Sequence, residues 1–244
     1  MITVHGANIT RAELSKIKPV TPENAGRRWC AIPHGKLLYA IRREVLSRGW
    51  EIKEQLLSTA RDGADMAGAL LIEKVRGVRV VPGTSLAIGF LHSNARRKAV
   101  QLTVGASVTC CANGLCTGNI LLNRVHDHTI DLSAEIKCAV DGYVEAAARI
   151  PNIVRGLKEH GLAPDEASEI LMEAGRKRLV GWAAIGRVDV EYRRPTFAEH
   201  GRNTSWALLN AFTYAARANI AATRQMEVYN TFRQILPVGQ TDGV

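Results

Sequence analysis

From Val100 to Cys111 apolar side chains alternate with polar or small ones at every position, and this period of two constrains the fold more than any other stretch. The apolar set is Val100, Leu102, Val104, Ala106, Val108 and Cys110, and the other set is Gln101, Thr103, Gly105, Ser107, Thr109 and Cys111. Successive side chains of a β-strand point to opposite faces of its sheet. The pattern therefore predicts a strand with one buried and one solvated face, as in an antiparallel sheet.

Neighbouring segments show weaker forms of the same period and predict an antiparallel meander. The expected strands are 50–58, 66–75 with a possible extension at 78–81, 86–90, 100–111 and 120–125. The expected turns are Asp62-Gly63-Ala64-Asp65, His92-Ser93-Asn94 and Asn113-Gly114. Asn-Gly is a strong turn signal because both residues adopt positive φ readily.

A helical period precedes and follows these strands. Residues 36–48 place apolar side chains on one face and end before Gly49, where a helix cap belongs. A long apolar seam comes after the meander, with Pro151 within it as the expected position of a kink or break. The seam consists of Ile136, Val140, Tyr143, Ala147, Ile150, Val154 and Leu157. Further helices are expected over 164–175, 176–186, 206–217 and 221–236.

This order predicts an α+β fold, in which an antiparallel β-meander packs against a long helix and a helical C-terminal part follows. We divide the chain into an irregular segment 1–35, an α+β core 36–162 and a helical part 163–244. Within the first segment, Thr10 and Glu13 fit a capping box for a short helix. Near the other end, Asn203, Thr204 or Ser205 can cap the helix in which Trp206 and Phe212 are expected to be core residues.

Charge gives the best indication of a partner. The chain has 244 residues and a net charge of +9, and no acidic residue occurs between Arg76 and His126. Three consecutive cations, Arg96, Arg97 and Lys98, follow the expected turn at His92. Such clusters suit the phosphates of nucleic acids, although a charged strand edge that only prevents aggregation would look the same. The candidate nucleic-acid-binding residues are Arg79, Arg96, Arg97, Lys98, Gln101, Thr103 and Arg124.

The sequence indicates neither a metal site nor a catalytic one. Cys110, Cys111 and Cys116 lack the paired spacing of zinc sites, and adjacent cysteines on a strand face opposite sides. His126 and His128 could share one face of an extended segment, but no second cluster completes a site. We therefore assign no catalytic residue, metal or cofactor, and expect free thiols. The absence of a secretory signal or a long apolar run predicts a cytoplasmic protein that does not span a membrane.

Several short motifs, in this order, resemble the phage/plasmid-like protein family, which has long been described as a domain of unknown function in phages and plasmids. The resemblance covers about residues 35–220. Its motifs are Gly89-Phe90-Leu91-His92-Ser93-Asn94, Val108 to Leu115, His126-Asp127-His128-Thr129, and Thr204 to Thr213. The order of helix, meander and helix also looks like that of the single-strand annealing proteins of phage recombination, which form rings and lay single strands along a basic groove.

The resemblance implies a protein of the bacterial host cytoplasm that binds single-stranded DNA, anneals strands in recombination and forms a homo-oligomer such as a ring. Two alternatives stay open. In the first, the chain is an accessory protein of a mobile element, and its basic face binds an acidic host protein in an anti-defence or regulatory role. In the second, it is a metal-dependent hydrolase centred on His126 and His128.

Overall fold

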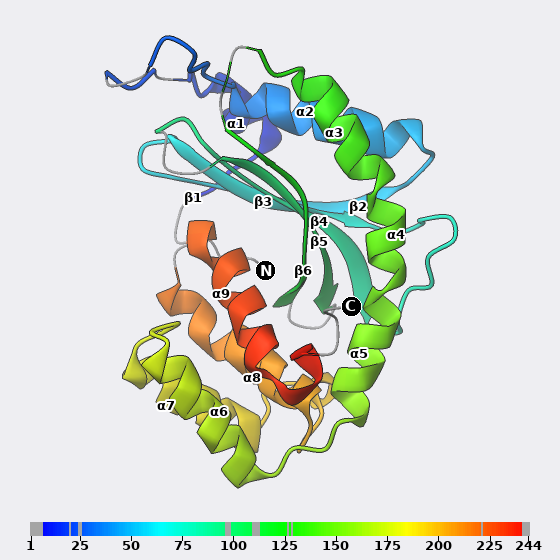
Figure 1. Cartoon of the computed structure of the whole chain (residues 1–244), viewed down its shortest axis with the longest axis vertical. Coiled ribbons are helices and arrows are strands. Elements are labelled where there is room, and N and C mark those ends of the chain that lie inside the picture. Colours follow the sequence, from blue (N-terminus) through cyan, green and yellow to red (C-terminus); the bar gives the residue numbers. More distant parts are fainter. Residues whose placement is uncertain are drawn as a thin grey trace.

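The computed structural model describes residues 7–19, 21–23, 26–95, 99–108, 113–125, 127, 129–220 and 222–240. A single antiparallel sheet forms its centre, with helices on both sides (Figure 1). The strands are β1 (Ala7–Asn8), β2 (Ile52–Ala60), β3 (Asp65–Ile72), β4 (Thr84–Ser93), β5 (Val100–Val108) and β6 (Asn113–Arg124). They lie side by side in chain order, so the predicted α+β fold with a β-meander is confirmed.

Two of the predicted strand boundaries are wrong. Residues 78–81 belong to the irregular connection between β3 and β4 and extend no strand. Asn113 and Gly114 lie inside β6, where they pair with Val108 and Ser107. The β5–β6 connection therefore falls on residues 109–112, which lie outside the described part of the chain. An Asn-Gly pair marks a turn only when the pairing register places it at the end of a strand.

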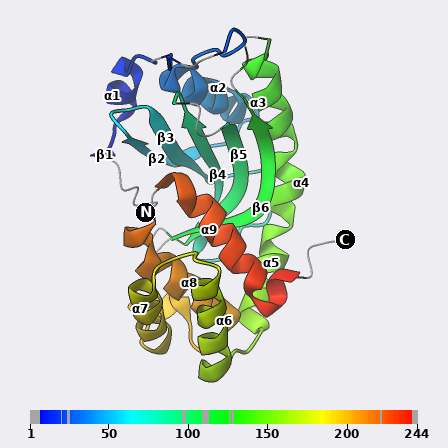
Figure 2. The same cartoon turned by 60° about the vertical axis from the view of Figure 1, so that its left-hand side comes forward.

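Helices cover both faces of the sheet, so the prediction of a solvated face is wrong. Figures 1 and 2 show α2 (His34–Ser47) and α3 (Leu132–Asp141) on one face, and α8 (Ser205–Ala216) and α9 (Ala222–Ile235) on the other. All eight residues of β3 are accordingly buried. The face under α8 and α9 carries small or short side chains, among them Ala67, Ala69 and Thr103. Small side chains let helices pack closely, and in a sequence they look like a solvated face.

The apolar seam after the meander is confirmed, since each of its seven residues is at most 1% exposed. It forms three consecutive helices, α3, α4 (Tyr143–Ala148) and α5 (Ile150–Glu159), with breaks at Gly142 and Arg149. Pro151 lies in the first turn of α5, where the missing N–H of proline has no helical partner to lose. The break therefore comes just before the proline, as the sequence predicts.

The C-terminal part adds α6 (Pro164–Arg176) and α7 (Trp182–Arg193), which lie at the end of the molecule opposite α1 (Arg11–Lys16) and α2 (Figures 1 and 2). The predicted helix over 176–186 is wrong, because residues 177–181 connect α6 to α7. Three 3-10 turns complete the described elements: η1 (Ala198–His200), η2 (Arg217–Asn219) and η3 (Pro237–Gln240).

Two predicted helix caps are confirmed by hydrogen bonds. Thr10 and Glu13 form the capping box of α1, and the Thr204 hydroxyl accepts from the N–H of Ala207 at the start of α8. Asn210 is buried and donates from its side chain to the carbonyl of Trp206 at 2.8 Å.

Aromatic packing fixes α9 to α8. The rings of Phe212 and Phe232 stack with centroids 3.7 Å apart and planes only 6° from parallel. Both side chains are fully buried, and Tyr229 packs edge-on against Phe212. The buried hydrophobic cluster runs continuously from Leu14 to Leu236, so the segments before and after residue 162 share one core.

Candidate nucleic-acid interface

The predicted binding residues are distributed over both ends of the sheet. Arg96, Arg97 and Lys98 lie outside the described residues. The described chain on either side of them, at Ser93 of β4 and Val100 of β5, lies at one end of the sheet. Arg124 pairs with Val100 and therefore lies at this same end, which we call the tip end. Arg79 is exposed in the β3–β4 connection at the opposite end. The length of β4, at about 3.3 Å per residue, separates the two ends.

The remaining candidates, Arg124, Gln101 and Thr103, each have a partner within the protein. Arg124 forms an ion pair with Glu135 of α3 at 3.0 Å. Gln101 is half-buried and donates to the side chain of Asn123 at 3.3 Å. Thr103 is buried, and its hydroxyl donates to the carbonyl of Val104 at 3.1 Å. Thr103 lies on a face of the sheet that helices cover, so its predicted contact with nucleic acid has no support from its exposure.

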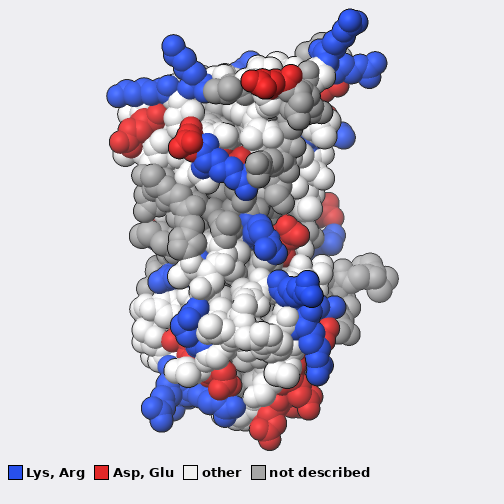
Figure 3. Space-filling view, turned by 90° about the vertical axis from the view of Figure 1, so that its left-hand side faces the viewer, with Lys and Arg blue, Asp and Glu red and all other residues white. Residues whose placement is uncertain are grey.

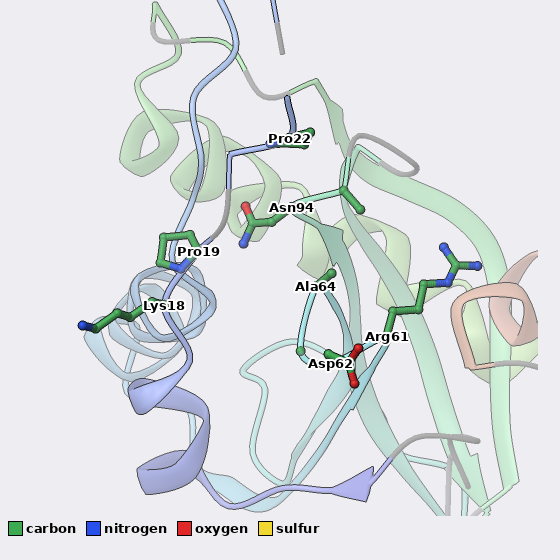
Figure 4. Close-up of a pocket in the computed structure, with 9 residues that line it drawn as sticks. Lys18, Pro19, Pro22, Arg61, Asp62, Ala64 and Asn94 are labelled. Carbon is green, nitrogen blue, oxygen red and sulfur yellow. The ribbon is translucent and has the colours of Figure 1, made fainter. Parts of the chain in front are cut away.

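A pocket of about 360 Å³ opens at the tip end, where three distant segments meet (Figure 4). The segment after α1, the β2–β3 turn and the β4–β5 turn line it. Its lining residues are Lys18, Pro19, Pro22, Arg61, Asp62, Gly63, Ala64, Asn94 and Ala95. In Figure 4 the Asn94 amide points into the space between the segments, whereas the ends of Lys18 and Arg61 point outward. The pocket thus has a largely uncharged wall with cations at its margin.

The β2–β3 turn is held in an unusual backbone conformation. Arg61 and Asp62 have φ values of 55° and 53°, and Gly63 follows at 84°. Residues other than glycine seldom adopt positive φ, and such strain often occurs at functional sites. An ion pair of 3.2 Å joins Arg61 to Asp65, whose carboxylate also accepts from the Ser93 hydroxyl at 2.5 Å. These contacts hold the β2–β3 and β4–β5 turns together.

Asn94 attaches the N-terminal segment to the sheet. Its amide oxygen accepts from the N–H of Ile32 at 3.1 Å, and its amide nitrogen donates to the carbonyl of the same residue at 3.1 Å. Its own backbone N–H donates to the carbonyl of Ala64 at 2.8 Å. Asn94 therefore joins the segment before α2 and the β2–β3 turn to the β4–β5 turn, two residues before Arg96 in the sequence.

Two buried histidines lie beneath this region. The Nδ1 atoms of His34 and His92 are 2.7 Å apart, and Nε2 of His34 is 2.6 Å from the carbonyl oxygen of Gly63. A carbonyl can only accept, so Nε2 of His34 carries a proton. In the neutral His34 ring the Nδ1 atom carries no proton, so it accepts a hydrogen bond from Nδ1–H of His92. Burial lowers the pKa of His34, against the opposing effects of the Gly63 carbonyl and the Asp65 carboxylate.

We expect the stability of the protein to fall on acidification below the ordinary histidine pKa. The pKa values of His34 and His200 are both lowered, chiefly by burial, so below about pH 6.5 the unfolded chain binds protons that the folded chain does not. The contribution of the two neutral histidines to the free energy of unfolding is therefore complete above that pH. It is lost as the pH falls towards their pKa values in the folded protein. Urea unfolding of wild type, His34→Gln and the exposed-site control Lys36→Gln at pH 7.5 and 5.5 measures this.

The pH-dependent loss should be smaller in His34→Gln than in wild type, with His200 supplying the remainder, and unchanged in Lys36→Gln. An equal loss in all three proteins would remove His34 as a source of the pH dependence.

The charged side chains on one flank of the molecule do not form a single basic field. In Figure 3 Lys and Arg occur in separate groups with Asp and Glu among them. A polyanion would accordingly contact local cationic groups. Near the predicted histidine motif, Asp127 accepts from the N–H and hydroxyl of Thr129, while Asp131 caps α3. His126 and His128 themselves lie outside the described residues.

Comparisons with known protein families, with curated proteins and with solved structures gave no match. Within the described residues, no three His, Cys, Asp or Glu side chains are grouped so that they could hold a metal ion. Cys30 and Cys138 are exposed free thiols, whereas Cys110 and Cys111 fall outside the described part of the chain. No helix within the described ranges is long and apolar enough to cross a bilayer.

Proposed function

We propose that this chain binds single-stranded DNA at the tip end of its sheet and brings complementary strands together. One observation carries the proposal: a pocket with Lys18 and Arg61 at its margin adjoins the point where the chain enters Arg96-Arg97-Lys98. Cations of this density suit a phosphate backbone, whose contacts supply most of the affinity for nucleic acid.

The arrangement of the helices favours binding at this end over binding across a sheet face. Helices cover both faces, whereas the tip end presents turns and an open pocket. Pro19, Pro22 and Ala64 give the pocket a partly apolar wall, which suits an unstacked base better than a phosphate. Asp62 is the carboxylate in its lining, so phosphates would bind at the cationic margin. Bases are available for such contacts in single strands and hidden in duplexes.

Changing Arg96, Arg97 and Lys98 together to alanine should weaken binding to a single-stranded oligonucleotide. It should also flatten the dependence of log K on log salt by about 0.7 for each phosphate that the variant no longer binds. Fluorescence anisotropy over a salt series measures both effects. The matched control is Arg76→Ala combined with Arg79→Ala, which removes exposed cations at the opposite end of the sheet. It should bind almost as wild type does.

An unchanged affinity and slope in the triple variant would remove the tip end from the binding site. A larger effect of the Arg76 and Arg79 changes would move the site to the opposite end. Mass measurement with and without DNA tests the oligomer that annealing proteins form. If nuclease-treated host lysate yields a stoichiometric protein partner and no DNA binds, the accessory-protein function replaces the proposed one.

A further inference from the structure

The connection between α6 and α7 contains a second residue in a strained backbone conformation. After the helix the N–H of Arg178 donates to the carbonyl of Gly175, and the N–H of Leu179 donates to that of Ala174. This pattern normally places glycine at the left-handed position, where Arg178 has a φ of 54°. An arginine there costs stability that glycine would not, by roughly 1 kcal/mol. Strain of this kind suggests that the side chain has a use.

An exposed tryptophan follows four residues later. Trp182, the first residue of α7, is 57% exposed, whereas Trp29 is half-buried and Trp50 and Trp206 are at most 5% exposed. Its six-membered ring lies directly over Gly175, so close that a Cβ on this glycine would come within 2.5 Å of the ring. Contact with α6 fixes the indole while much of its surface stays open. A rigid, exposed aromatic ring loses little conformational entropy when a second ring stacks on it.

Three consecutive cations, Arg176, Lys177 and Arg178, precede this tryptophan in the sequence. Lys177 pairs with Glu173 at 3.2 Å, but Arg176 and Arg178 are exposed and form no ion pair with any described residue. Met172, 45% exposed, lies one helical turn before Arg176. We call Met172, Arg176, Arg178 and Trp182 the α6–α7 platform. The platform combines an exposed indole ring with two arginines that form no ion pair with a described residue.

We propose that the α6–α7 platform is a second contact site for single-stranded nucleic acid, in which one base stacks on Trp182 and the adjoining phosphates bind Arg176 and Arg178. The inference rests on the proposed function and extends it to the helical part. A protein interface would also use tryptophan and arginine, so quenching by a free oligonucleotide is the observation that distinguishes a single strand from that partner. A duplex offers phosphates but hides the faces of its bases. A single strand uses both features of the platform.

Tryptophan fluorescence of the full-length protein tests this site directly. A single-stranded oligothymidine of about 20 nucleotides should quench the exposed Trp182 by stacking, and the matching duplex should not. Trp182→Ala should remove most of the quench, leaving only what the half-buried Trp29 contributes, and should weaken binding roughly ten-fold, which is the order of one stacked base. Gly175→Ala introduces a better helix former but displaces the indole, and should reduce both the quench and the affinity.

Arg178→Gly separates binding from folding, because glycine is the favoured residue at this backbone position. The variant should unfold at the same or a higher urea concentration than wild type. It should nevertheless bind more weakly, with a salt slope lower by about 0.7. Val190→Ala is the control, because it truncates an exposed apolar side chain of α7 outside the platform. It should leave quench, affinity and slope unchanged.

The outcomes distinguish failure of the platform from failure of the proposed function. If single-stranded DNA binds and depends on Arg96 to Lys98, while Trp182→Ala and Arg178→Gly bind as wild type does, the platform is not a contact site and the tip end remains. If wild type binds no single-stranded DNA, both proposals fall. Quenching by vesicles containing anionic phosphatidylglycerol but not by DNA would instead make the platform a lipid contact and overturn the inference.

Discussion

Replacing Gly68 by alanine should destabilise the protein by about 3 kcal/mol, a large part of the 5–15 kcal/mol that stabilises a typical domain. Gly68 lies in the middle of β3, opposite Phe90 of β4. A Cβ there would come within 2.5 Å of both the Phe90 ring and the carbonyl oxygen of Leu56. The carbonyl belongs to the neighbouring strand, and the ring is fully buried, so neither can move without disturbing the sheet.

Urea unfolding at pH 7.5 measures this effect, with Gly186→Ala as the control. Gly186 is exposed in the interior of α7, and nothing lies within 4 Å of a Cβ built there. Alanine is the better helix former, so this variant should gain about 0.5–1 kcal/mol. Substitution of glycine by alanine should therefore lower the stability at Gly68 and raise it at Gly186. Equal stability of Gly68→Ala and wild type would mean that β3 and β4 do not pack as closely as described.

Truncating Phe232 to alanine should cost about 3–5 kcal/mol, the usual range for a buried phenylalanine. Its ring is fully buried and stacks on Phe212, which fixes α9 to α8. Because α9 covers β3 and β6, removing this ring weakens the attachment of the helical part to the sheet. Unfolding followed by circular dichroism and by tryptophan fluorescence measures the change.

Ile120→Ala is the control for Phe232, because Ile120 is 59% exposed and its truncation should change stability by no more than about 0.5 kcal/mol. Coincident transitions by both probes in Phe232→Ala would show that α9 and the sheet unfold together. Two separate transitions would show that α9 undocks by itself and would contradict a single cooperative unit.

Sequence periodicity predicts the meander and the seam of α3 to α5 because each depends on local spacing. The spacing of Ile136 and Val140, for example, reflects one buried helical face whatever packs against it. The pattern at Thr103 could not reveal its environment in the same way. Whether a small polar face meets solvent or a helix depends on α8 and α9, which are far away in the sequence.

In the candidate sites, too, some features are visible in the sequence and others arise only when distant segments meet in the fold. The run Arg96 to Lys98 is visible in the sequence, but the pocket beside it needs Pro19, Asp62 and Asn94 to converge from three segments. The up-and-down order of the meander, which no single motif encodes, separates Arg79 in the β3–β4 connection from Arg124 at the end of β6. The α6–α7 platform had a local signal, three basic residues shortly before a tryptophan. A helical period that runs on through 176–186 conceals it, because the left-handed turn at Arg178 lacks the glycine that usually marks a helix end.

The coverage of the sheet by helices from both ends of the chain has a consequence during synthesis. The strands are complete once Arg124 has been made, but α8 begins only at Ser205, about 80 residues later. At about 5–20 residues per second, the face that α8 and α9 will cover stays bare for several seconds on the ribosome. A nascent sheet with that face open and its edge strands unpaired can pair with other chains. We therefore expect that chains truncated before residue 205 aggregate, and that folding chaperones associate with the nascent protein during this interval.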